Sequence, residues 1–497
     1  MVMVPRKHRR WQGSVVWLLC CVVSVACSER AADTGSAPGA SPGSARSPAA
    51  SAERPRNAII LLLDTLRADR LGCYGHERNT SPVLDSLAER GVCFEQAFSP
   101  APWTLPATGS LLSGMPPERC FDEASKLSRS LISSFSAAGW STAAFTEAAF
   151  VSSYFGMDRG FDQFVEAGAM RTVIEGETVA GGQEGAGIVT TMAAAKRWLE
   201  LQATGEQTEP FVLLVHSYEV HMPYNRKRWS KQLPSGRFGE RLEMSDLRKM
   251  QKGALVPTAE ELAYVAALYD GGVRFADKQV GELLAALDEL GLADDTLIVV
   301  TSDHGEELGA HHPSFLADHG HSLKDDLLNV PLLIMDPTTS WPVSRVPWQV
   351  RLMDVLPTVA GLLGVPLPDD VVGRSLVPLM AHDSAGSHRP LFAGHTKAGP
   401  PRRALRDGSH KLIVRREGAT PLGTEPSPPL PSRQLYDLLL DPGELQNVES
   451  SHGEDVERLE RLLAAWEQQF SEGAGTLRPE ALDDEVMRQL QALGYVR

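Results

Sequence analysis

Four short apolar runs, separated by helical stretches, constrain the fold of this chain more than any other feature. They are rich in Leu, Ile and Val and comprise residues 57–63, 211–215, 296–300 and 330–335. Between them, residues 259–290 carry apolar side chains at helical spacing, a pattern that Gly271 and Gly272 interrupt. Uninterrupted apolar runs of this length are typical of strands buried on both faces. The pattern predicts an α/β fold with a large, mixed but mainly parallel sheet flanked by helices.

Acidic and histidine side chains follow two of these runs directly. Asp64 ends the first run, and Asp303 with His304 ends the third. In an open α/β sheet, ligands bind beyond the carboxyl ends of the strands, where the connecting loops converge. Two carboxylates and an imidazole form a plausible ligand set for a divalent cation. An acid after an apolar run is more often a cap or a loop residue, so the prediction depends on these side chains meeting.

A hydroxyl stands at the start of a predicted helix in the segment 102–114. Thr104 lies two residues before Pro106, whose fixed φ suits the first turn of a helix that runs through Leu112. At the positive end of that helix, the Thr104 hydroxyl would be favoured as an alkoxide. The alternative interpretation is that Thr104 is an ordinary N-cap residue. Together with Asp64, it predicts a metal-activated nucleophile.

Other polar residues near the predicted strand ends are weaker candidates. His221 follows the second run, and His319 and His321 precede the fourth. Such histidines can bind a metal or contact an anionic ester, whereas lone histidines in loops are commonly just solvated. Arg67, three residues after Asp64, is either a support for the site or a surface arginine.

The first 56 residues read as an export signal followed by a tether. Basic residues precede an apolar stretch, 15–26, that is too short to span a bilayer comfortably. Small residues lead into Cys27, which resembles the lipid-bearing cysteine of bacterial lipoproteins; ordinary cleavage and an uncleaved anchor are the alternatives. Residues 28–56 are rich in Ser, Ala, Gly and Pro and predict a disordered linker. We expect an exported protein held at the cell envelope by an N-terminal lipid anchor.

Charge and cysteine content exclude two classes of function. The formal net charge is −15, with no basic stripe, so nucleic acid is not an expected partner. Beyond Cys27, only Cys73, Cys93 and Cys120 remain, without the spacing of a zinc site or a redox motif. Cysteine chemistry is therefore not the expected function.

Several motifs in order resemble the sulfatase branch of the alkaline phosphatase superfamily over residues 57–497. The matching blocks are 64–69 with 72–75, 102–114, 221 with 223–224, 301–306, 155–162, 373–376, 435–437 with 441–442, and 490–496. The resemblance implies a catalytic domain over 57–388 and a C-terminal subdomain over 389–497 with a small antiparallel sheet and a helix. It also implies a metal site formed by Asp64, Thr104, Asp303 and His304.

The sequence departs from this family at the nucleophile. Sulfatases carry Cys or Ser within C/S-x-P-x-R and convert it to formylglycine, whereas the same frame here reads Thr-Leu-Pro-Ala-Thr from Thr104 to Thr108. Threonine cannot become formylglycine, so an ester formed on it must be cut by a second nucleophile such as water. Thr65 replaces a second ligand Asp, His304 occupies a site that is often Asn, and the family's Lys-Trp-His block is missing near 145–147. Threonine favours phosphoryl or phosphonyl chemistry, as in relatives of the superfamily that use it.

These observations predict a metal-dependent hydrolase of anionic esters, with phosphate or phosphonate esters expected and Thr104 as nucleophile. His221 and His319, together with His321, would contact the ester oxygens, bind a second metal or protonate the leaving group. Zinc or manganese is favoured by His304, and calcium or magnesium are the alternatives. The substrate would be a small anionic ester or an envelope glycan or lipid. Three alternatives stay open: a sulfuric ester hydrolase acting without formylglycine, a transferase of phosphoryl head groups, and a non-catalytic binding protein on a sulfatase scaffold.

Overall fold

The computed structural model describes residues 54–167, 171–174, 177–180, 187–204, 209–238, 242–311, 315–382, 389–397, 399–416 and 430–470. They belong to one compact unit, residues 51–497. The predicted signal, the lipid-site Cys27, most of the predicted linker and the closing motif at 490–496 lie outside the described residues. In the part of the chain that is described, no helix has the length and apolarity needed to cross a membrane.

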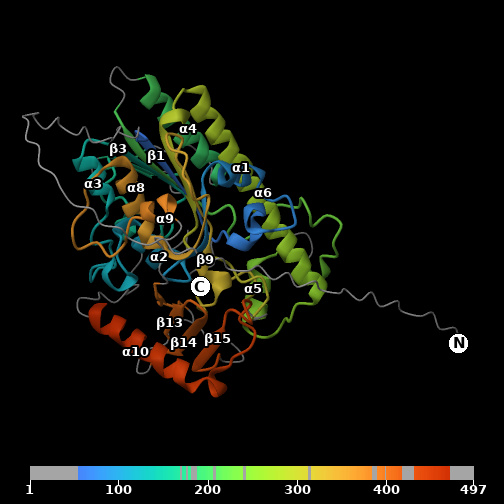
Figure 1. Ribbon diagram of the computed structural model, residues 1–497. Coiled ribbons are helices and arrows are strands. Elements are labelled where there is room, and N and C mark those ends of the chain that lie inside the picture. The colour runs from blue at the N-terminus through green and yellow to red at the C-terminus, as the bar shows by residue number, and fades with distance from the viewer. Residues whose placement is uncertain are drawn as a thin grey trace, which may run out of the picture. The chain divides into compact units, whose positions relative to one another are not determined.

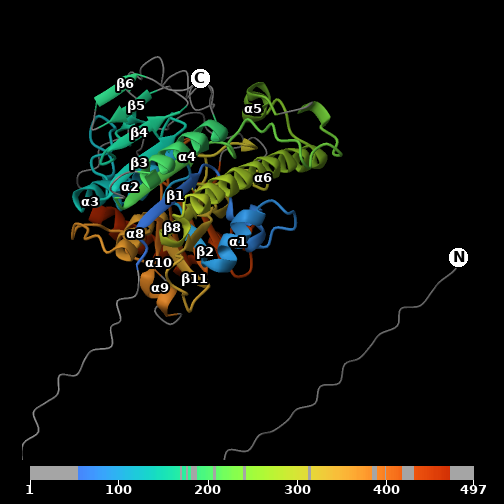
Figure 2. The same ribbon diagram turned by 90° about the horizontal axis from the view of Figure 1, so that it is seen from above.

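The large sheet has eleven strands and mixes parallel with antiparallel pairing. Its main path runs β11-β2-β10-β8-β1-β7-β3-β4-β5-β6, with β9 paired to β2, and Figure 2 shows the strands from β6 to β11 across the molecule. The strands are β1 Asn57–Leu63, β2 Val92–Phe98, β3 Ser141–Thr146, β4 Gln163–Glu166, β5 Arg171–Ile174, β6 Glu177–Ala180, β7 Phe211–Ser217, β8 Thr296–Thr301, β9 Asn329–Val330, β10 Leu332–Met335 and β11 Arg345–Arg351. The central strands β8, β1, β7, β3 and β4 run parallel to one another. The expected architecture is confirmed.

Strand β1 lies at the centre and is buried along its whole length. Successive side chains of a strand point to opposite faces of the sheet, so an inner strand covered on both faces is apolar at nearly every position. Ile60 and Leu62 pack into the core on one face, whereas Ile59, Leu61 and Leu63 pack into the core on the other. This double burial explains the continuous apolar run and holds the end of β1 firmly in place.

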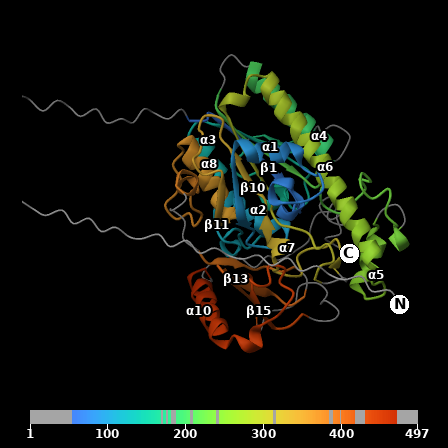
Figure 3. The ribbon, with the colours of Figure 1, turned by 45° about the vertical axis from the view of Figure 1, so that its right-hand side comes forward.

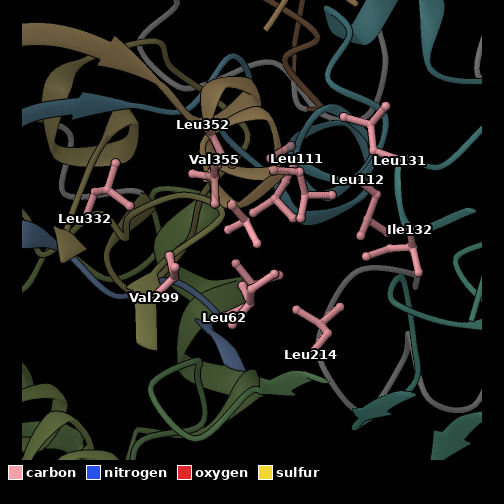
Figure 4. Close-up of a cluster of buried hydrophobic side chains, with 14 of the residues drawn as sticks. Leu62, Leu111, Leu112, Leu131, Ile132, Leu214, Val299, Leu332, Leu352 and Val355 are labelled. Atoms are coloured by element: carbon pink, nitrogen blue, oxygen red, sulfur yellow. The ribbon is translucent and has the colours of Figure 1, made fainter. Parts of the chain in front are cut away.

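Helices cover both faces of the sheet. One face is covered by α2 (Thr104–Ser113), α3 (Ile132–Ala137), α8 (Val355–Leu363) and α9 (Val377–Ala381), and the other by α1 (Pro82–Arg90), α4 (Ile188–Thr204) and α6 (Ala259–Glu289). Figure 3 shows α4 and α6 on the side opposite α3 and α8. In the core beneath α2, Leu111 and Leu112 face Leu62 of β1 and Leu214 of β7 (Figure 4). This packing fixes the axis of α2, whose first residue is Thr104. Two shorter helices are α5 (Met244–Gln251) and α7 (Asp325–Leu328).

The fourth apolar run differs from the simplest expectation of one parallel strand. Pro331 divides residues 330–335 between β9 and β10, and β10 pairs antiparallel with both β8 and β2. Proline has no N–H for a sheet hydrogen bond, so a strand breaks there. The carbonyl of Pro331 instead accepts a hydrogen bond from the Thr301 hydroxyl at 2.8 Å.

Helix α6 is continuous through the two glycines that interrupt its apolar pattern. A Cβ atom added to Gly271 would lie 2.0 Å from the backbone oxygen of Arg226, and one on Gly272 would lie 3.2 Å from the oxygen of Glu219. The glycines therefore let the loop 219–226 approach the helix closely. That loop carries His221. The two glycines that interrupt the apolar pattern are therefore the place where this candidate functional loop packs against the helix.

A second, four-stranded antiparallel sheet follows, in the order β12 (Leu391–Ala393), β13 (Arg402–Asp407), β14 (His410–Arg415) and β15 (Arg433–Asp437). Helix α10 (Gly453–Phe470) packs on one face, where Leu405, Leu412 and Leu435 contact its apolar residues. The other face packs against Phe98 of the large sheet and Leu323. Figure 1 shows this sheet and α10 below the large sheet. The small antiparallel sheet and helix implied by the family resemblance are confirmed.

We predict that Gly271→Ala destabilises the protein by about 2 kcal/mol or more, because the added methyl collides with rigid backbone. Alanine normally stabilises a helix interior by up to about 1 kcal/mol relative to glycine. Gly281→Ala in the same helix is the matched control, since its nearest neighbour is a movable Val83 methyl at 3.0 Å. Urea unfolding of both variants measures the effect. Equal free energies of unfolding for the two variants would contradict the close approach at Gly271.

Candidate metal centre and nucleophile

Three of the predicted ligands meet at the carboxyl ends of adjacent strands. β1 and β8 pair in parallel with Leu62 opposite Thr301, which brings the residues that follow both strands to the same edge of the sheet. Ligand atoms of Asp64, Asp303 and His304 all lie within 4.8 Å of one another, and all three side chains are buried. The sheet register therefore assembles a compact Asp-Asp-His group from residues about 240 positions apart.

The Thr104 hydroxyl joins this group from the start of α2. Thr104 is the first residue of α2, and its oxygen donates a hydrogen bond to Asp64 Oδ2 at 3.1 Å and lies 3.3 Å from His304 Nε2. Trp103, with extended backbone, occupies the N-cap position, so Thr104 is not a plain N-cap residue. Pro106 is the third residue of α2, so the expectation that it lies in the first turn of the helix is confirmed. The positive end of α2 is consequently directed at the carboxylates.

The unsatisfied atoms of this group fit a divalent cation. Asp64 Oδ1 and Asp303 Oδ2 have no hydrogen-bond partner among the described residues, although both are buried. Burial, reinforced by the charge of Asp303, raises the pKa of Asp64 well above its ordinary value. Two buried carboxylates this close, each with one oxygen that lacks a hydrogen-bond partner, are costly without a compensating charge. A cation bound between them removes both the unpaired oxygens and the repulsion.

The orientation of His304 also suits a metal ligand. Its Nδ1 lies 2.8 Å from the carbonyl oxygen of Gly305. A carbonyl can only accept, so Nδ1 carries the proton and the lone pair belongs to Nε2, the atom nearest Thr104. Burial lowers the pKa of His304, which keeps the ring neutral. Asp64, Thr104, Asp303 and His304 would therefore hold the cation with three oxygens and one nitrogen, a donor set that zinc and manganese accept.

Two further predicted histidines lie beside the group. The rings of His304 and His319 have centroids 4.4 Å apart, and those of His319 and His221 lie 5.1 Å apart. Nδ1 of His221 is 2.6 Å from the carbonyl of Met222, and Nδ1 of His319 is 2.9 Å from Glu306 Oε1. Burial lowers the pKa of His221 to about 3 and that of His319 well below its ordinary value. Both rings are therefore neutral, with Nε2 as the accepting nitrogen when Nδ1 donates.

His321 and Arg67 have other partners. The His321 ring stacks on Phe315 with centroids 4.0 Å apart, and its Nε2 lies 4.0 Å from Glu307 Oε2. Arg67 donates through Nε and Nη2 to Asp69, each at 2.8 Å, and through Nη1 to the carbonyl of Glu306 at 2.7 Å. The guanidinium thus ties the segment after β1 to the segment after β8.

Sequence reasoning overlooked several residues of this site. His216, at the end of β7, has its Nε2 3.6 Å from Asp64 Oδ2, and burial lowers its pKa to about 4. Glu306 accepts hydrogen bonds from His319 and, at 2.9 Å, from the Tyr224 hydroxyl, and so orients both rings. The position of His216 at a strand end was an available signal. Glu306, two residues after His304, could have been found by the same rule.

Glu147 follows β3, where the family's Lys-Trp-His block is missing. Its Oε2 accepts a hydrogen bond from the backbone N–H of Tyr218 at 3.1 Å. Burial raises the pKa of Glu147 to about 7. The hydrogen bonds from Ser217 and Tyr218 favour the charged form and lower the pKa, but their effect is smaller than that of burial. This acid supports the segment that leads to His221.

Comparison with known proteins agrees with this geometry. The sequence model of the Sulfatase family matches residues 56–365, which is more than half of the chain. The chain belongs to the sulfatase family. That family, within the alkaline phosphatase superfamily, is one of ester hydrolases, so the sulfatase resemblance noted in the motifs is confirmed.

Individual relatives match over different lengths. Arylsulfatase K of Mus musculus is 33% identical over 215 residues, covering 41% of this chain and 36% of that protein. The chain thus spans little more than a third of the length of this relative. Steryl-sulfatase of Mus musculus is 27% identical over 431 residues, covering 69% of this chain and 68% of that protein. Among solved structures, the phosphonate monoester hydrolase of Agrobacterium radiobacter has a TM-score of 0.61 at 23% identity, covering 84% of this chain and 96% of that one. This structural match supports the fold.

We predict opposite effects of Asp303→Asn with and without metal. In chelator, the variant should be more stable than the wild type by about 1 kcal/mol, because it removes one of two buried like charges. With zinc or manganese at 100 times its Kd, the wild type should gain about 2.7 kcal/mol and the variant much less. Thermal unfolding in both conditions measures this, with the exposed Asp288→Asn as control. No metal-dependent stabilisation of the wild type would contradict the site.

We also predict a pH-dependent contribution of Glu147 to stability. An acid with a raised pKa binds more protons when folded, so its contribution falls as pH rises from its unfolded value of about 4.5 to the folded value of about 7. The difference corresponds to roughly 3 kcal/mol. Glu147→Gln should therefore gain stability over the wild type by up to that amount between pH 5 and pH 8, measured by urea unfolding. The exposed Glu209→Gln should track the wild type; a parallel pH profile for Glu147→Gln would refute the assignment.

Proposed function

We propose that this protein is a metal-dependent hydrolase of phosphate or phosphonate esters with Thr104 as its nucleophile. The observation that carries the proposal is the Thr104 oxygen, 3.1 Å from Asp64 Oδ2 and 3.3 Å from His304 Nε2 at the start of a helix. A hydroxyl placed between a carboxylate pair and an imidazole is positioned to become a nucleophile when a cation binds beside it. When bound, a zinc or manganese ion would supply Lewis-acid stabilisation of the hydroxyl as an alkoxide and of the ester oxygens.

The remaining roles belong to the chain's own side chains. The Thr104 oxygen forms a bond to phosphorus while the bond from phosphorus to the leaving oxygen breaks. Thr104 gives up one proton and the leaving oxygen takes up one, so the alcohol leaves as a neutral molecule. The Thr104 proton is directed at Asp64 Oδ2 in the resting geometry. Water then cuts the threonyl ester and releases the acid. The neutral rings of His221 and His319 would accept hydrogen bonds from that water through Nε2.

The preference for phosphorus over sulfur rests on how the intermediate is released. A formylglycine hydrate can expel sulfate by returning to an aldehyde, whereas a threonyl ester has no such route and needs an external water. The fold neighbour from Agrobacterium radiobacter is named a phosphonate monoester hydrolase, and we extend that substrate class to this chain as part of the proposal.

A second candidate function is hydrolysis of sulfuric esters without formylglycine. It is favoured by the matches to arylsulfatase K and steryl-sulfatase. A further proposal, motivated by the predicted linker at residues 28–56, is that the protein transfers a phosphoryl head group to an envelope glycan or lipid. A non-catalytic binding protein on a sulfatase scaffold is the last alternative. We also propose that the protein is exported and carries a lipid on Cys27. Its proposed substrate is a small anionic ester or an envelope glycan or lipid.

The experiment is a panel of aryl phosphate monoesters, diesters, phosphonates and sulfates, assayed after loading with zinc, manganese, calcium or magnesium. Thr104→Ala should lose activity by roughly 10³-fold or more, and Thr104→Ser should retain part of it. Ser113→Ala, at the far end of the same helix, is the matched control. Activity confined to sulfates would overturn the phosphorus preference. A new ester formed with an added alcohol would identify a transferase, and full activity of Thr104→Ala would exclude its role as nucleophile.

A further inference from the structure

The segment 394–397, directly after β12, connects the two loops that flank the site. On one side, the N–H of Gly394 donates to the carbonyl of Pro100 at 2.9 Å. The carbonyl of His395 accepts from Nε1 of Trp103, the residue before Thr104. On the other side, the N–H of Lys397 donates to the carbonyl of Gly320 at 2.6 Å. The small sheet thereby places Lys397 between the nucleophile loop and the loop that carries His319.

Gly320 makes this close approach possible. Its φ is +79°, a left-handed conformation that favours glycine, and a Cβ atom added to it would lie 2.9 Å from Cβ of Lys397. Any larger residue between His319 and His321 would displace the lysine backbone. Glycine at position 320 therefore allows the backbone of Lys397 to pack against this loop.

The ammonium group of Lys397 lies close to the site. Nζ is 5.9 Å from the ring centroid of Trp103 and 5.6 Å from that of Phe150. Trp103 directly precedes Thr104 in the chain, so the charge lies on the side of the site that carries the nucleophile. The side chain is half-buried, so part of it remains accessible to solvent.

The site otherwise offers little positive charge to an anionic substrate. Asp64 and Asp303, the proposed metal ligands, are acidic. Arg67 is engaged by Asp69 and by the carbonyl of Glu306. A phosphate or sulfate ester still carries negative oxygens that point away from the metal, and burying them without a counter-charge is costly. A lysine ammonium with three rotatable donors suits such oxygens.

We propose that Lys397 binds a non-bridging oxygen of the substrate's phosphate or sulfate group, so that the segment after β12 supplies the anion-binding cation of the site. This inference rests on the proposed function and names the residue that recognises the anion. The position of Lys397 supports this role, because the backbone hydrogen bonds from Gly394 to Pro100 and from Lys397 to Gly320 hold it between the nucleophile loop and the loop that carries His319. Burial lowers the pKa of Lys397 to about 7, although the nearby charge of Asp318 raises it. A bound anion would favour the charged form of the ammonium.

The test is isothermal titration of the metal-loaded full chain with inorganic phosphate and, separately, with inorganic sulfate. Lys397→Met should weaken binding of the preferred anion by tenfold or more, and Lys397→Arg should recover most of the affinity. Lys278→Met is the matched control, because this lysine is 64% exposed on α6 and pairs only with Glu282, at 3.2 Å, among the described ion pairs. Metal content and melting temperature of Lys397→Met should equal those of the wild type.

The outcomes separate this inference from the proposed function. Unchanged anion affinity in Lys397→Met overturns the inference, even if ester hydrolysis is observed. Loss of metal or a lowered melting temperature in both Lys397 variants would show a structural role and overturn it as well, as would a metal-loaded wild type that binds neither anion. Tenfold weaker anion binding in Lys397→Met, without turnover of any ester by the wild type, would support the anion site. This result would contradict only the hydrolase proposal.

Discussion

The close approach of two buried carboxylates, Asp64 and Asp303, is the constraint on which the site depends. Neither fills its hydrogen-bonding capacity with the described protein groups, and burial, together with the charge of Asp303, raises the pKa of Asp64. A sequence retains such an arrangement only if something compensates it, since burial of unpaired charge is among the costliest features of a protein interior. The neighbouring Thr104 oxygen and His304 Nε2 complete a donor set for a cation. The chemistry proposed for the chain follows from this compensation.

The rest of the fold holds that arrangement rigidly. β1 is buried on both faces, so the position of Asp64 is set by two hydrophobic cores at once. The same core that covers one face fixes α2, and with it Thr104. On the opposite face, Gly271 lets the loop carrying His221 pack against α6. A site that must oppose electrostatic repulsion is thus placed on the most deeply buried elements, where displacement would cost packing energy.

The small sheet contributes to the site as well as to the architecture. Its first strand leads into the segment that contacts both flanking loops and carries Lys397. Metal ligands and nucleophile therefore come from the large sheet, whereas the proposed anion-binding cation comes from the small one. The interface between the sheets, formed around Phe98 and Leu323, keeps these parts in register.

The sequence by itself determined the sheet class, the places of the central strands β1, β7 and β8 and the candidates Asp64, Thr104, Asp303 and His304, because these features are local. An apolar run predicts a buried strand, the polar residue after it predicts an edge site, and Pro106 predicts the helix that begins near Thr104. The tertiary structure decided what local patterns cannot carry. It divided the fourth run at Pro331, kept α6 continuous through Gly271 and gave Arg67 protein partners. It also brought Lys397 close to a metal centre whose proposed ligands all lie more than 90 residues earlier in the chain. Contacts between distant segments depend on register and packing, and no residue pattern near Lys397 records them.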